Sequence, residues 1–398
     1  MAASHTTRLA RCLGAGAALG LAAVAGFRGD ENAARAQMQM REDKRAGETG
    51  APPCVVFMGT GTSSVNPHLN CVLGLQPSFN EVGGCETCQK ALRDGPPEVN
   101  KNVRGNPSML ICFDAHSTST KTDDEPQHDR VGAQRHFVQI DCGKTFRETA
   151  LTWYPRHGIP RLDAVVITHD HADAVFGLDD LRLVAKPGNP VEVYTSLHTY
   201  NMIKRAFPYL VRDPAPDFIG PLAHLADQDP SKVDAMQDEV KTFIATLKYK
   251  VMSTPSLDDA LSPFSVAGLD ITPLPVYHGA NYLSLGFAFG KSNRKFVYLS
   301  DVSEIPPKIM DQLRKWDIEY LVIDTLHKKR KYPTHLSLEQ SLEIIEELRP
   351  AKSFLIGVSH NFEHDRDNAM LANLKETKGI DVQIPHDGLK IELHNIEL

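Results

Sequence analysis

Short apolar runs, most of them ending in small polar residues, recur along the chain after residue 53. Runs of about four to eight residues with this composition, bounded by turn-forming residues, are typical of buried strands. They occupy residues 54–58, 109–113, 137–140, 163–168, 191–194, 296–300, 320–324 and 353–357. We predict a strand in each of them.

A helical period appears in residues 336–348. Ser337, three residues before Gln340, predicts a capping box at the start of this helix. Alternating strands and helices, together with β-rich stretches, indicate an α/β protein whose sheets are covered by helices. The apolar residues that share one face of the predicted helix are Leu338, Leu342, Ile345 and Leu348.

Two stretches look inserted into this pattern. Residues 114–130 are polar, acidic and poor in apolar side chains, which is typical of a solvated loop. Residues 211–262 contain several prolines and a helical run near 231–247, so we expect a surface excursion and a candidate lid over a site. The expected organisation is an N-terminal segment at 1–50 and one folded domain at 51–398.

The N-terminal segment has the features of a targeting peptide. Residues 1–29 contain arginines and no acidic residue, and residues 12–27 are apolar and rich in Ala and Gly. This run falls short of the ~20 residues that a membrane-spanning helix needs. We expect a transit peptide for an organelle, a mitochondrion or a plastid. A secretory signal cleaved near residues 34–36 and a flexible N-terminus of a cytoplasmic protein are the alternatives, and no later segment predicts a membrane span.

The composition narrows the class of protein. The 398 residues include 43 Lys+Arg and 50 Asp+Glu, which gives a formal net charge of −7. A hydrophobic fraction of 41% and a charged fraction of 23% are ordinary for a folded soluble chain, which excludes collagen-like, coiled-coil and wholly disordered proteins. A mildly acidic chain is unsuited to general polyanion binding, so we expect no stable nucleic-acid complex.

Histidine and aspartate cluster directly after the strand predicted at 163–168. His169, His171 and Asp173 alternate with other residues, so both imidazoles project the same way from one tight loop. Neutral imidazole nitrogen and carboxylate oxygen suit Zn²⁺, Mn²⁺ or Fe²⁺. A metal site is the functional interpretation, and two surface histidines in an acidic turn are the structural alternative.

This cluster resembles the H-x-H-x-D-H signature of the metallo-β-lactamase superfamily. Other motifs of the superfamily follow in the same order, at residues 58–63 (MGTGTS), 275–279 (PVYHG), 298–301 (YLSD), 334–335 (TH), 359–362 (SHNF) and 387–388 (DG). The resemblance covers residues 54–393. It is closest to the cyclic phosphodiesterase of the phosphonate pathway, in the ribonuclease Z-like branch, and to its eukaryotic relatives. The resemblance implies an αββα sandwich with the metal site at one edge of the sheets.

The resemblance also implies the ligands of a catalytic metal, zinc or manganese. The implied ligands of the first metal are His169, His171, His278 and the bridging Asp301, and Asp173 is implied for a second metal. The superfamily has histidines where this chain has Ala174 and Gly357. Both departures fall on the second metal, so a mononuclear site is favoured. His364 is a candidate replacement ligand, and the alternative for it is a solvated residue at a helix start.

The implied chemistry is hydrolysis. A divalent ion lowers the pKa of its bound water to about 7 and polarises a phosphoryl or carbonyl oxygen. Asp173 is placed to orient that water or to accept its proton. The resemblance implies that His335 protonates the leaving oxygen, with helix capping as the alternative. Asp324, at the end of the predicted strand 320–324, is a candidate carboxylate that supports the metal site from outside its ligands. The basic run at 328–331 is either a solvated turn or an attractor for phosphate.

Seven cysteines are too few for a disulfide scaffold in a chain of this length. Cys54, Cys112 and Cys142 lie in or beside apolar, strand-like runs, where we expect buried free thiols. Cys85 and Cys88 form a C-x-x-C among turn residues, a spacing that suits metal or redox chemistry.

The resemblance implies a structural zinc near this C-x-x-C motif, held by cysteines and a histidine. Cys85, Cys88 and His360 match family positions, whereas the third cysteine of the family aligns with Gly83. Cys71 is the candidate for the missing thiolate, which completes a tetrahedral Cys₃His set. A redox pair and plain free thiols are the alternatives. Zinc here favours a reducing compartment for the mature protein.

We therefore expect a metal-dependent hydrolase, most specifically a phosphodiesterase acting on a cyclic or nucleotide-derived phosphodiester through a metal-activated water. Ala174 and Gly357 also fit a degenerate member retained as a binding or scaffold protein. Thioester or carbonyl hydrolysis stays open, as does cleavage of RNA, although the acidic net charge counts against RNA. The expected partner is a small phosphodiester or nucleotide-like substrate, with a homodimer as an open alternative.

Overall fold

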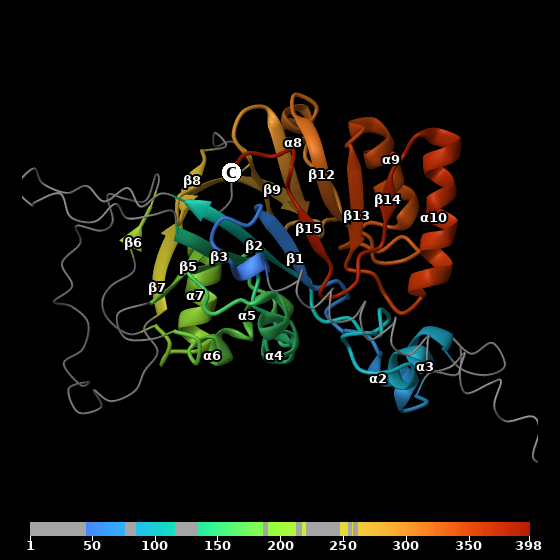
Figure 1. Ribbon diagram of the computed structural model, residues 1–398, viewed down its shortest axis with the longest axis horizontal. Helices are drawn as coiled ribbons and strands as arrows, with labels where there is room; N and C mark the ends of the chain where they lie inside the picture. The colour runs from blue at the N-terminus through green and yellow to red at the C-terminus, as the bar shows by residue number, and fades with distance from the viewer. Residues whose placement is uncertain are drawn as a thin grey trace, which may run out of the picture.

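The computed structural model describes residues 45–75, 85–115, 134–185, 190–211, 217–219, 247–253, 257 and 262–398. Within these residues the chain forms two sheets with helices on their outer faces (Figure 1). The α/β class and the αββα sandwich expected from the sequence are confirmed.

The first sheet has the strand order β15 (Lys390–Glu392), β1 (Cys54–Gly59), β2 (Ser108–Ala115), β3 (Gln134–Ile140), β4 (Ala164–Val166), β5 (Val191–Ser196), β7 (Leu247–Met252) and β6 (Asp217–Phe218). The second sheet has the order β14 (Val382–Gln383), β13 (Lys352–Ile356), β12 (Asp317–Asp324), β11 (Arg294–Leu299), β10 (Leu283–Phe289), β9 (Leu269–Tyr277) and β8 (Phe264–Val266).

Both sheets contain a parallel part. Strands β3, β4, β5 and β7 pair in parallel in the first sheet, and β11, β12, β13 and β14 do so in the second. The carboxyl ends of parallel strands lie at the same edge of a sheet, which is where ligands bind in open α/β sheets. The loops after β4, β11, β12 and β13 are therefore the natural place for a site.

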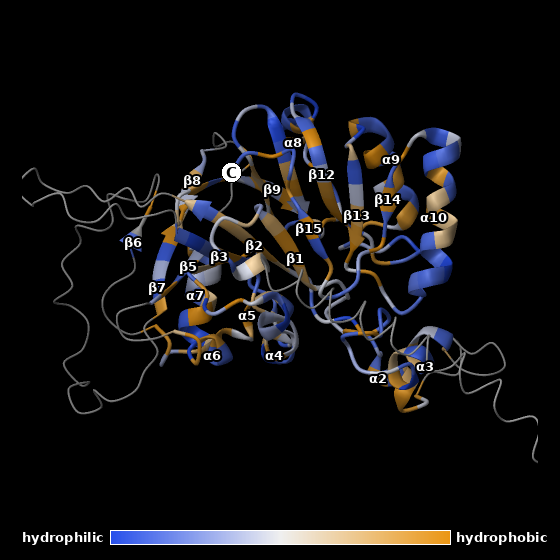
Figure 2. Ribbon diagram, viewed as in Figure 1, coloured by the Kyte–Doolittle hydropathy of each residue, from blue (hydrophilic) through white to orange (hydrophobic). Residues whose placement is uncertain are grey.

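Three apolar layers hold the sandwich together. Side chains such as Phe57, Phe287 and Phe354 fill the space between the sheets. The outer layers lie under the helices, and Figure 2 shows apolar strands beneath the largely hydrophilic α10. The helices are η1 (Arg45–Gly47), α4 (Phe146–His157), α5 (Ala172–Val175), α6 (Leu178–Leu181) and α7 (Leu197–Ala206) in the first half, and α8 (Pro307–Leu313), α9 (Leu338–Leu348) and α10 (His364–Lys378) in the second.

A small lobe projects beyond the sandwich below β13 and α10 in Figure 1. It contains the helices α2 (Leu69–Val72) and α3 (Glu86–Arg93), which lie in the connection between β1 and β2. This lobe carries three of the cysteines predicted to bind zinc.

Each run predicted as a strand overlaps an observed strand. The predicted helix at 336–348 is α9, and its capping box is present: the side chain of Ser337 accepts from the backbone of Gln340, and the side chain of Gln340 accepts from the backbone of Ser337. Cys54, Cys112 and Cys142 are buried free thiols, as expected.

The prediction of a surface excursion at 211–262 is wrong for residues 247–252. Residues 247–252 form β7, which pairs with β5 and β6 inside the first sheet. Leu247, Tyr249 and Val251 are buried, because alternate residues of this strand face the core. The helical run was predicted near 231–247, and its residues up to 246 are not among those that the structure describes.

Other predictions fall partly outside the described residues. Asp114 and Ala115 of the expected loop at 114–130 end β2, and the rest of that loop lies outside. The predicted targeting segment lies outside up to residue 44. Within the part of the chain that the structure describes, no helix has both the length and the apolar character needed to cross a bilayer.

Candidate metal centre and cysteine cluster

The predicted ligands of the catalytic metal come together at one edge of the sheets. His169, His171 and Asp173 lie in the turn after β4 and in the first turn of α5. His278 directly follows β9, and Asp301 comes shortly after β11. Three separate segments thus supply side chains to one place.

The three imidazoles form a compact group. Their ring centroids are 4.6 Å apart for His169 and His171, 5.2 Å for His169 and His278, and 5.0 Å for His171 and His278. One ring nitrogen from each lies within 4.8 Å of the others. Zn–N bonds are about 2 Å long, so nitrogens on one ion lie about 3–4 Å apart. The group therefore fits a single ion with small adjustments.

Hydrogen bonds fix the tautomer of His169. Its Nδ1 lies 2.8 Å from the hydroxyl of Thr168, and that hydroxyl donates to Asp141, also at 2.8 Å. Nδ1 therefore carries the proton, and the lone pair is on Nε2. This Nε2 is buried without a hydrogen-bond partner among the described residues. Burial lowers the pKa of His169 to about 3, so the ring is neutral, as a metal ligand must be.

His278 is oriented in the same way. Its Nδ1 donates to the backbone carbonyl of Thr334 at 2.7 Å, which leaves the lone pair on Nε2. That Nε2 lies 3.3 Å from Nδ1 of His171 and 4.0 Å from Oδ1 of Asp301. A ring-nitrogen lone pair beside a buried carboxylate favours a cation between them. The donor set therefore fits a divalent metal.

Two buried carboxylates border the same group. Asp173 and Asp301 are both buried, and Asp301 has a left-handed backbone with φ of 54°. Burial, followed by the charge of Asp301, raises the pKa of Asp173. A bound divalent ion would be the largest local charge and would offset both effects.

The second metal position that the resemblance implies has no ligand atom at residues 174 and 357 of this chain. Ala174 is buried and carries no ligand atom. Gly357 has a φ of +67°, and a Cβ there would lie 2.6 Å from Oδ1 of Asp324. A larger residue at 357 would have to displace Asp324. The geometry therefore favours one catalytic metal.

His335, which is half-buried, and Asp324, which is buried, form a hydrogen-bonded pair beside the imidazole group. Nδ1 of His335 lies 2.8 Å from Oδ2 of Asp324, which also accepts from the backbone of Val302 at 3.1 Å. The rings of His335 and His278 are 4.9 Å apart. Burial lowers the pKa of His335, but the charge and hydrogen bond of Asp324, together with the charges of Asp301 and Asp173, outweigh it and raise that pKa to about 9. A protonated imidazole beside a metal site can act as a general acid.

The structure does not bring His364 into the metal group. This residue lies at the start of α10, where Nδ1 contacts the guanidinium of Arg104 at 3.2 Å and Nε2 contacts Asn368 at 3.3 Å. It is buried rather than solvated, contrary to the structural alternative for this position. Burial and then Arg104 lower its pKa to about 3.

The cysteine cluster forms between the small lobe and the turn after β13. Nδ1 of His360 lies 3.2 Å from the Sγ of Cys71, 3.3 Å from that of Cys85 and 3.7 Å from that of Cys88. All four ligand atoms lie within 4.8 Å of one another. Hydrogen bonds from Cys88 and then from His360 lower the pKa of the Cys85 thiol. Three sulfurs and one imidazole fit a tetrahedral zinc site, with Cys71 in place of the cysteine missing at Gly83.

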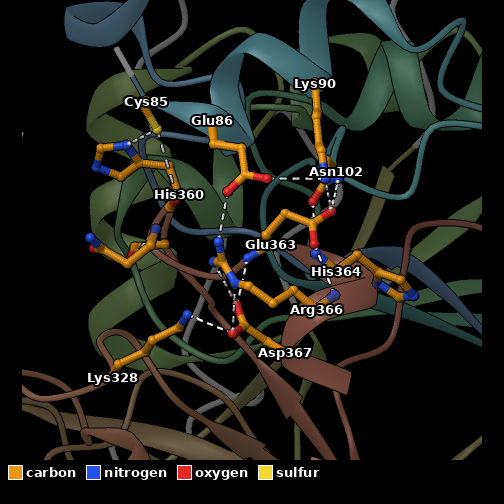
Figure 3. Close-up of polar contacts among 12 residues, drawn as sticks. Cys85, Glu86, Lys90, Asn102, Lys328, His360, Glu363, His364, Arg366 and Asp367 are labelled. Carbon is orange, nitrogen blue, oxygen red and sulfur yellow. Dashed lines mark hydrogen bonds and ion pairs between the residues drawn. The ribbon is translucent and has the colours of Figure 1, made fainter. Parts of the chain in front are cut away.

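Ion pairs beside Cys85 and His360 join the small lobe to α10 (Figure 3). Glu86 of α3 pairs with Arg366 at 2.7 Å, and Lys90 of α3 lies 3.3 Å from Glu363, the N-cap of α10. Glu363 also accepts from Asn102 at 2.9 Å. These contacts place the lobe against the body of the protein on the same side as His360.

The basic run at 328–331 divides into two parts. Lys328 pairs with Asp367 of α10 at 2.6 Å (Figure 3), so its charge is already neutralised. Lys329, Arg330 and Lys331 are exposed. Arg330 lies over the ring of Tyr332 at 5.6 Å, and that ring is 6.2 Å from the ring of His335.

Two motifs of the resemblance have a structural role. The hydroxyl of Thr60, in the MGTGTS motif, donates to Asp387 at 2.8 Å. The other carboxylate oxygen of Asp387 accepts from the backbone of Gly105 at 2.6 Å. These bonds tie the loop after β1 to the chain before β15.

Several side chains that support the imidazoles were not found from the sequence. Thr168 and Asp141 hold His169, and Tyr282 stacks on His171 with its ring centroid 5.1 Å away. Asp141 and Tyr282 lie far from these histidines in the sequence and meet them only in the folded chain, and no linear motif marks the hydroxyl of Thr168 as a partner of the neighbouring His169.

Comparisons with known proteins agree with this geometry. A family model described as the beta-lactamase superfamily domain matches residues 136–358. The structure is similar to a crystal structure of a diphosphatase from the PhnP family, with 25% identity, a TM-score of 0.57, and coverage of 86% of this chain and 97% of that one. It also shares its fold with Zn(2+)-bound PqqB from Methylobacterium extorquens, with 14% identity, a TM-score of 0.53, and coverage of 85% and 100%.

One curated relative differs in length. An octanoyltransferase of Porphyromonas gingivalis (strain ATCC BAA-308 / W83) is 26% identical over 307 residues, which cover 77% of this chain and 46% of that protein. The chain thus spans about half the length of this relative. The matched family model, the two-sheet sandwich and the gathered histidines and aspartates agree with one another. The chain belongs to the beta-lactamase superfamily, the metallo-β-lactamase fold family of metal-dependent hydrolases.

Proposed function

We propose that this protein is a phosphodiesterase that uses one divalent metal ion, zinc or manganese, to hydrolyse a cyclic or nucleotide-derived phosphodiester. The observation that carries the proposal is the position of the His335–Asp324 pair, 4.9 Å from the ring of His278. A proton donor beside a group of metal ligands is what cleavage of an ester with a poor leaving group requires, so this position supports the proposal.

We assign a separate role to each side chain of the group. His169, His171, His278 and Asp301 would hold the ion, which supplies an activated water and polarises a phosphoryl oxygen. Asp173 borders the group and accepts a proton or orients the water. Asp324 accepts from Nδ1 of His335, so the proton on Nε2 is the one available to the leaving oxygen.

Two observations support a phosphate-containing substrate. The PhnP-family protein that this structure resembles is named a diphosphatase. The exposed Lys329, Arg330 and Lys331 lie in the same loop as His335 and add positive charge at its outer end. Clustered charge of one sign attracts a substrate of the opposite sign.

Replacement of His335 tests the proposal. A general acid contributes about 10²–10⁴-fold to the rate, so His335→Ala should slow hydrolysis of an alkyl phosphodiester by about that factor. It should slow bis(p-nitrophenyl) phosphate far less, because p-nitrophenolate leaves without a proton. His169→Ala is the companion variant and should abolish both activities. Equal losses on both esters in His335→Ala would contradict the role of His335.

Hydrolysis of a carbonyl ester or thioester is the second candidate. The curated relative is named an octanoyltransferase, and acyl transfer takes place at a carbonyl carbon. A metal-bound water attacks a carbonyl carbon by the same means as a phosphorus atom. Hydrolysis of an octanoyl thioester that His169→Ala abolishes, without any phosphodiesterase activity in the wild type, would favour this candidate.

The cysteine cluster has a separate role in the proposal. We propose that Cys71, Cys85, Cys88 and His360 bind a structural zinc ion that fastens the small lobe to the end of β13. Their mutual distances support it. All four positions are filled by protein, which is typical of a structural site, whereas a catalytic site keeps a position open.

A further inference from the structure

The three imidazoles of the metal group are held in different ways. His169 and His278 are buried, and each has one ring nitrogen in a hydrogen bond, to Thr168 and to the carbonyl of Thr334. His171 is exposed. Its Nδ1 contacts only Nε2 of His278, at 3.3 Å, and in the part of the chain that the structure describes no hydrogen bond fixes its own Nε2. An exposed imidazole whose outer nitrogen has no such bond keeps rotational freedom, and a metal that orders the ring must overcome that entropy.

The ring of Tyr282 supplies the missing restraint. It lies parallel to His171, with 5.1 Å between the centroids and 10° between the planes. The edges of His169 and His198 close around the same ring, each with its centroid at 6.2 Å. Because histidines surround it, the ring is a packing surface for His171 rather than a platform for substrate.

The tyrosine is itself fixed at both ends. Its hydroxyl accepts from the backbone N–H of Asp170 at 3.2 Å and donates to the carboxylate of Asp170. The second carboxylate oxygen of Asp170 lies 3.2 Å from Nε2 of His198. The backbone carbonyl of Tyr282 accepts from the N–H of His278 at 2.9 Å. A short turn thus ties the ring to two of the metal-binding segments at once.

We propose that Tyr282 is a positioning residue for the metal ligand His171, and that Asp170, with His198 behind it, holds the tyrosine hydroxyl in place. The proposal rests on the metal site of the proposed function. The residue between the two histidines of the H-x-H motif thus acts through a tyrosine more than 100 positions away in the chain. Groups that orient metal ligands typically contribute about 10–100-fold to metal affinity or activity.

Metal affinity tests this role without any need for a substrate. The probe is Mn²⁺, which prefers nitrogen and oxygen ligands to thiolates and so avoids the cysteine cluster. The free ion is followed by its paramagnetic resonance signal in the full-length protein, with zinc left on the cysteines. Tyr282→Leu should weaken Mn²⁺ binding by about 10–100-fold. Tyr282→Phe keeps the ring and should lie between Tyr282→Leu and the wild type.

A second pair of variants separates positioning from stability. Asp170→Asn keeps an oxygen that accepts from the tyrosine hydroxyl and should bind Mn²⁺ better than Asp170→Ala does. Tyr209→Leu is the control, because Tyr209 is a partly exposed tyrosine whose hydroxyl contacts Asp179, which is none of the candidate metal ligands. This control should bind Mn²⁺ as the wild type does. Retained zinc on the cysteines shows that a variant is folded.

The outcomes distinguish this proposal from the proposed function. Wild-type Mn²⁺ affinity in folded Tyr282→Leu would overturn the positioning role and leave the metal site standing. Lower melting temperatures with unchanged affinity would show a purely structural role and would also overturn it. A wild-type protein that binds neither Mn²⁺ nor a second zinc would overturn the metal site together with the positioning role.

Discussion

At the scale of single residues, the most informative position is a glycine. Gly357 stands where the resemblance to the superfamily implies a metal-binding histidine, and its lack of a Cβ leaves room for the carboxylate of Asp324. Asp324 in turn holds His335. The carboxylate of Asp324 thus occupies the space beside the glycine and bonds the imidazole of His335. We infer that the Asp324–His335 pair depends on a small residue at position 357.

The pair Gly357→Ala and Gly379→Ala tests this arrangement. Both glycines have a φ of +67°, but a Cβ at 379 meets nothing within 4 Å, whereas a Cβ at 357 meets Asp324 at 2.6 Å. Backbone strain alone should cost about 1–2 kcal/mol of unfolding free energy in Gly379→Ala. Gly357→Ala should lose about 2–4 kcal/mol and slow alkyl diester hydrolysis at least ~10-fold, because Asp324 must move.

Urea unfolding and steady-state rates measure the two effects. If Gly357→Ala loses no more stability than Gly379→Ala and keeps full activity on the alkyl ester, then the carboxylate adapts without cost. The idea that position 357 must stay small for His335 to be held would then be wrong.

At the scale of elements, much of the fold could be predicted from the sequence. The runs that became β1, β2, β11, β12 and β13 are almost wholly apolar between their ends, because most of their residues are buried on both faces of the sheet. Strand β7 was missed because its pattern, LKYKVM, carries lysines on one face and adjoins a polar stretch rich in proline. Only its pairing with β5 identifies it as a sheet strand.

The ligands of the candidate sites could be predicted from the sequence, but the residues that support them could not. Motifs within a few residues of a strand end located the metal ligands, and the C-x-x-C motif located the cysteines. Tyr282 was missed because its contact with His171 depends on how the turn after β9 packs against the turn after β4. His364 was offered as a ligand from its place in the sequence, but the buried guanidinium of Arg104 holds it elsewhere.

The small lobe is the element that depends most on metal. Helices α2 and α3 are short, and α2 has no buried residue. Cys85→Ser should therefore release one zinc and lower the melting temperature while the catalytic metal stays bound. Zinc binding contributes on the order of 10 kcal/mol to folding in small zinc modules, and we expect less in this large domain, where three apolar layers hold the rest.

A buried cysteine outside the cluster provides the control for that variant. Cys142→Ala leaves a cavity in the core under α4 and should lower the melting temperature without releasing zinc. Elemental analysis and thermal unfolding on the two variants are the measurements. Unchanged zinc content and melting in Cys85→Ser would favour the alternative of free thiols.

At the scale of the whole molecule, both candidate metal sites lie at the carboxyl ends of strands. The catalytic group follows β4, β9 and β11, and His360 of the cysteine cluster follows β13. Gly357 and Ser359 lie in the turn after β13, between the two sites. The hydroxyl of Ser359 is 3.0 Å from Nδ1 of His327, which lies in the loop that leads to His335. The two sites are thus close neighbours along one edge, yet each has its own complete set of side chains.

Two separate sets of ligands give a definite metal content for the molecule. Ala174 and Gly357 leave the second catalytic position with the carboxylates of Asp173 and Asp301, and two carboxylates hold an ion more weakly than a set that also contains imidazoles. The full-length chain, saturated with zinc and then desalted, should therefore retain two zinc ions. His169→Ala should retain one, on the cysteines, and Cys85→Ser should retain one, on the histidines. Three tightly held ions in the wild type would contradict the mononuclear site, because a further side chain would then have to take the place of the missing imidazoles.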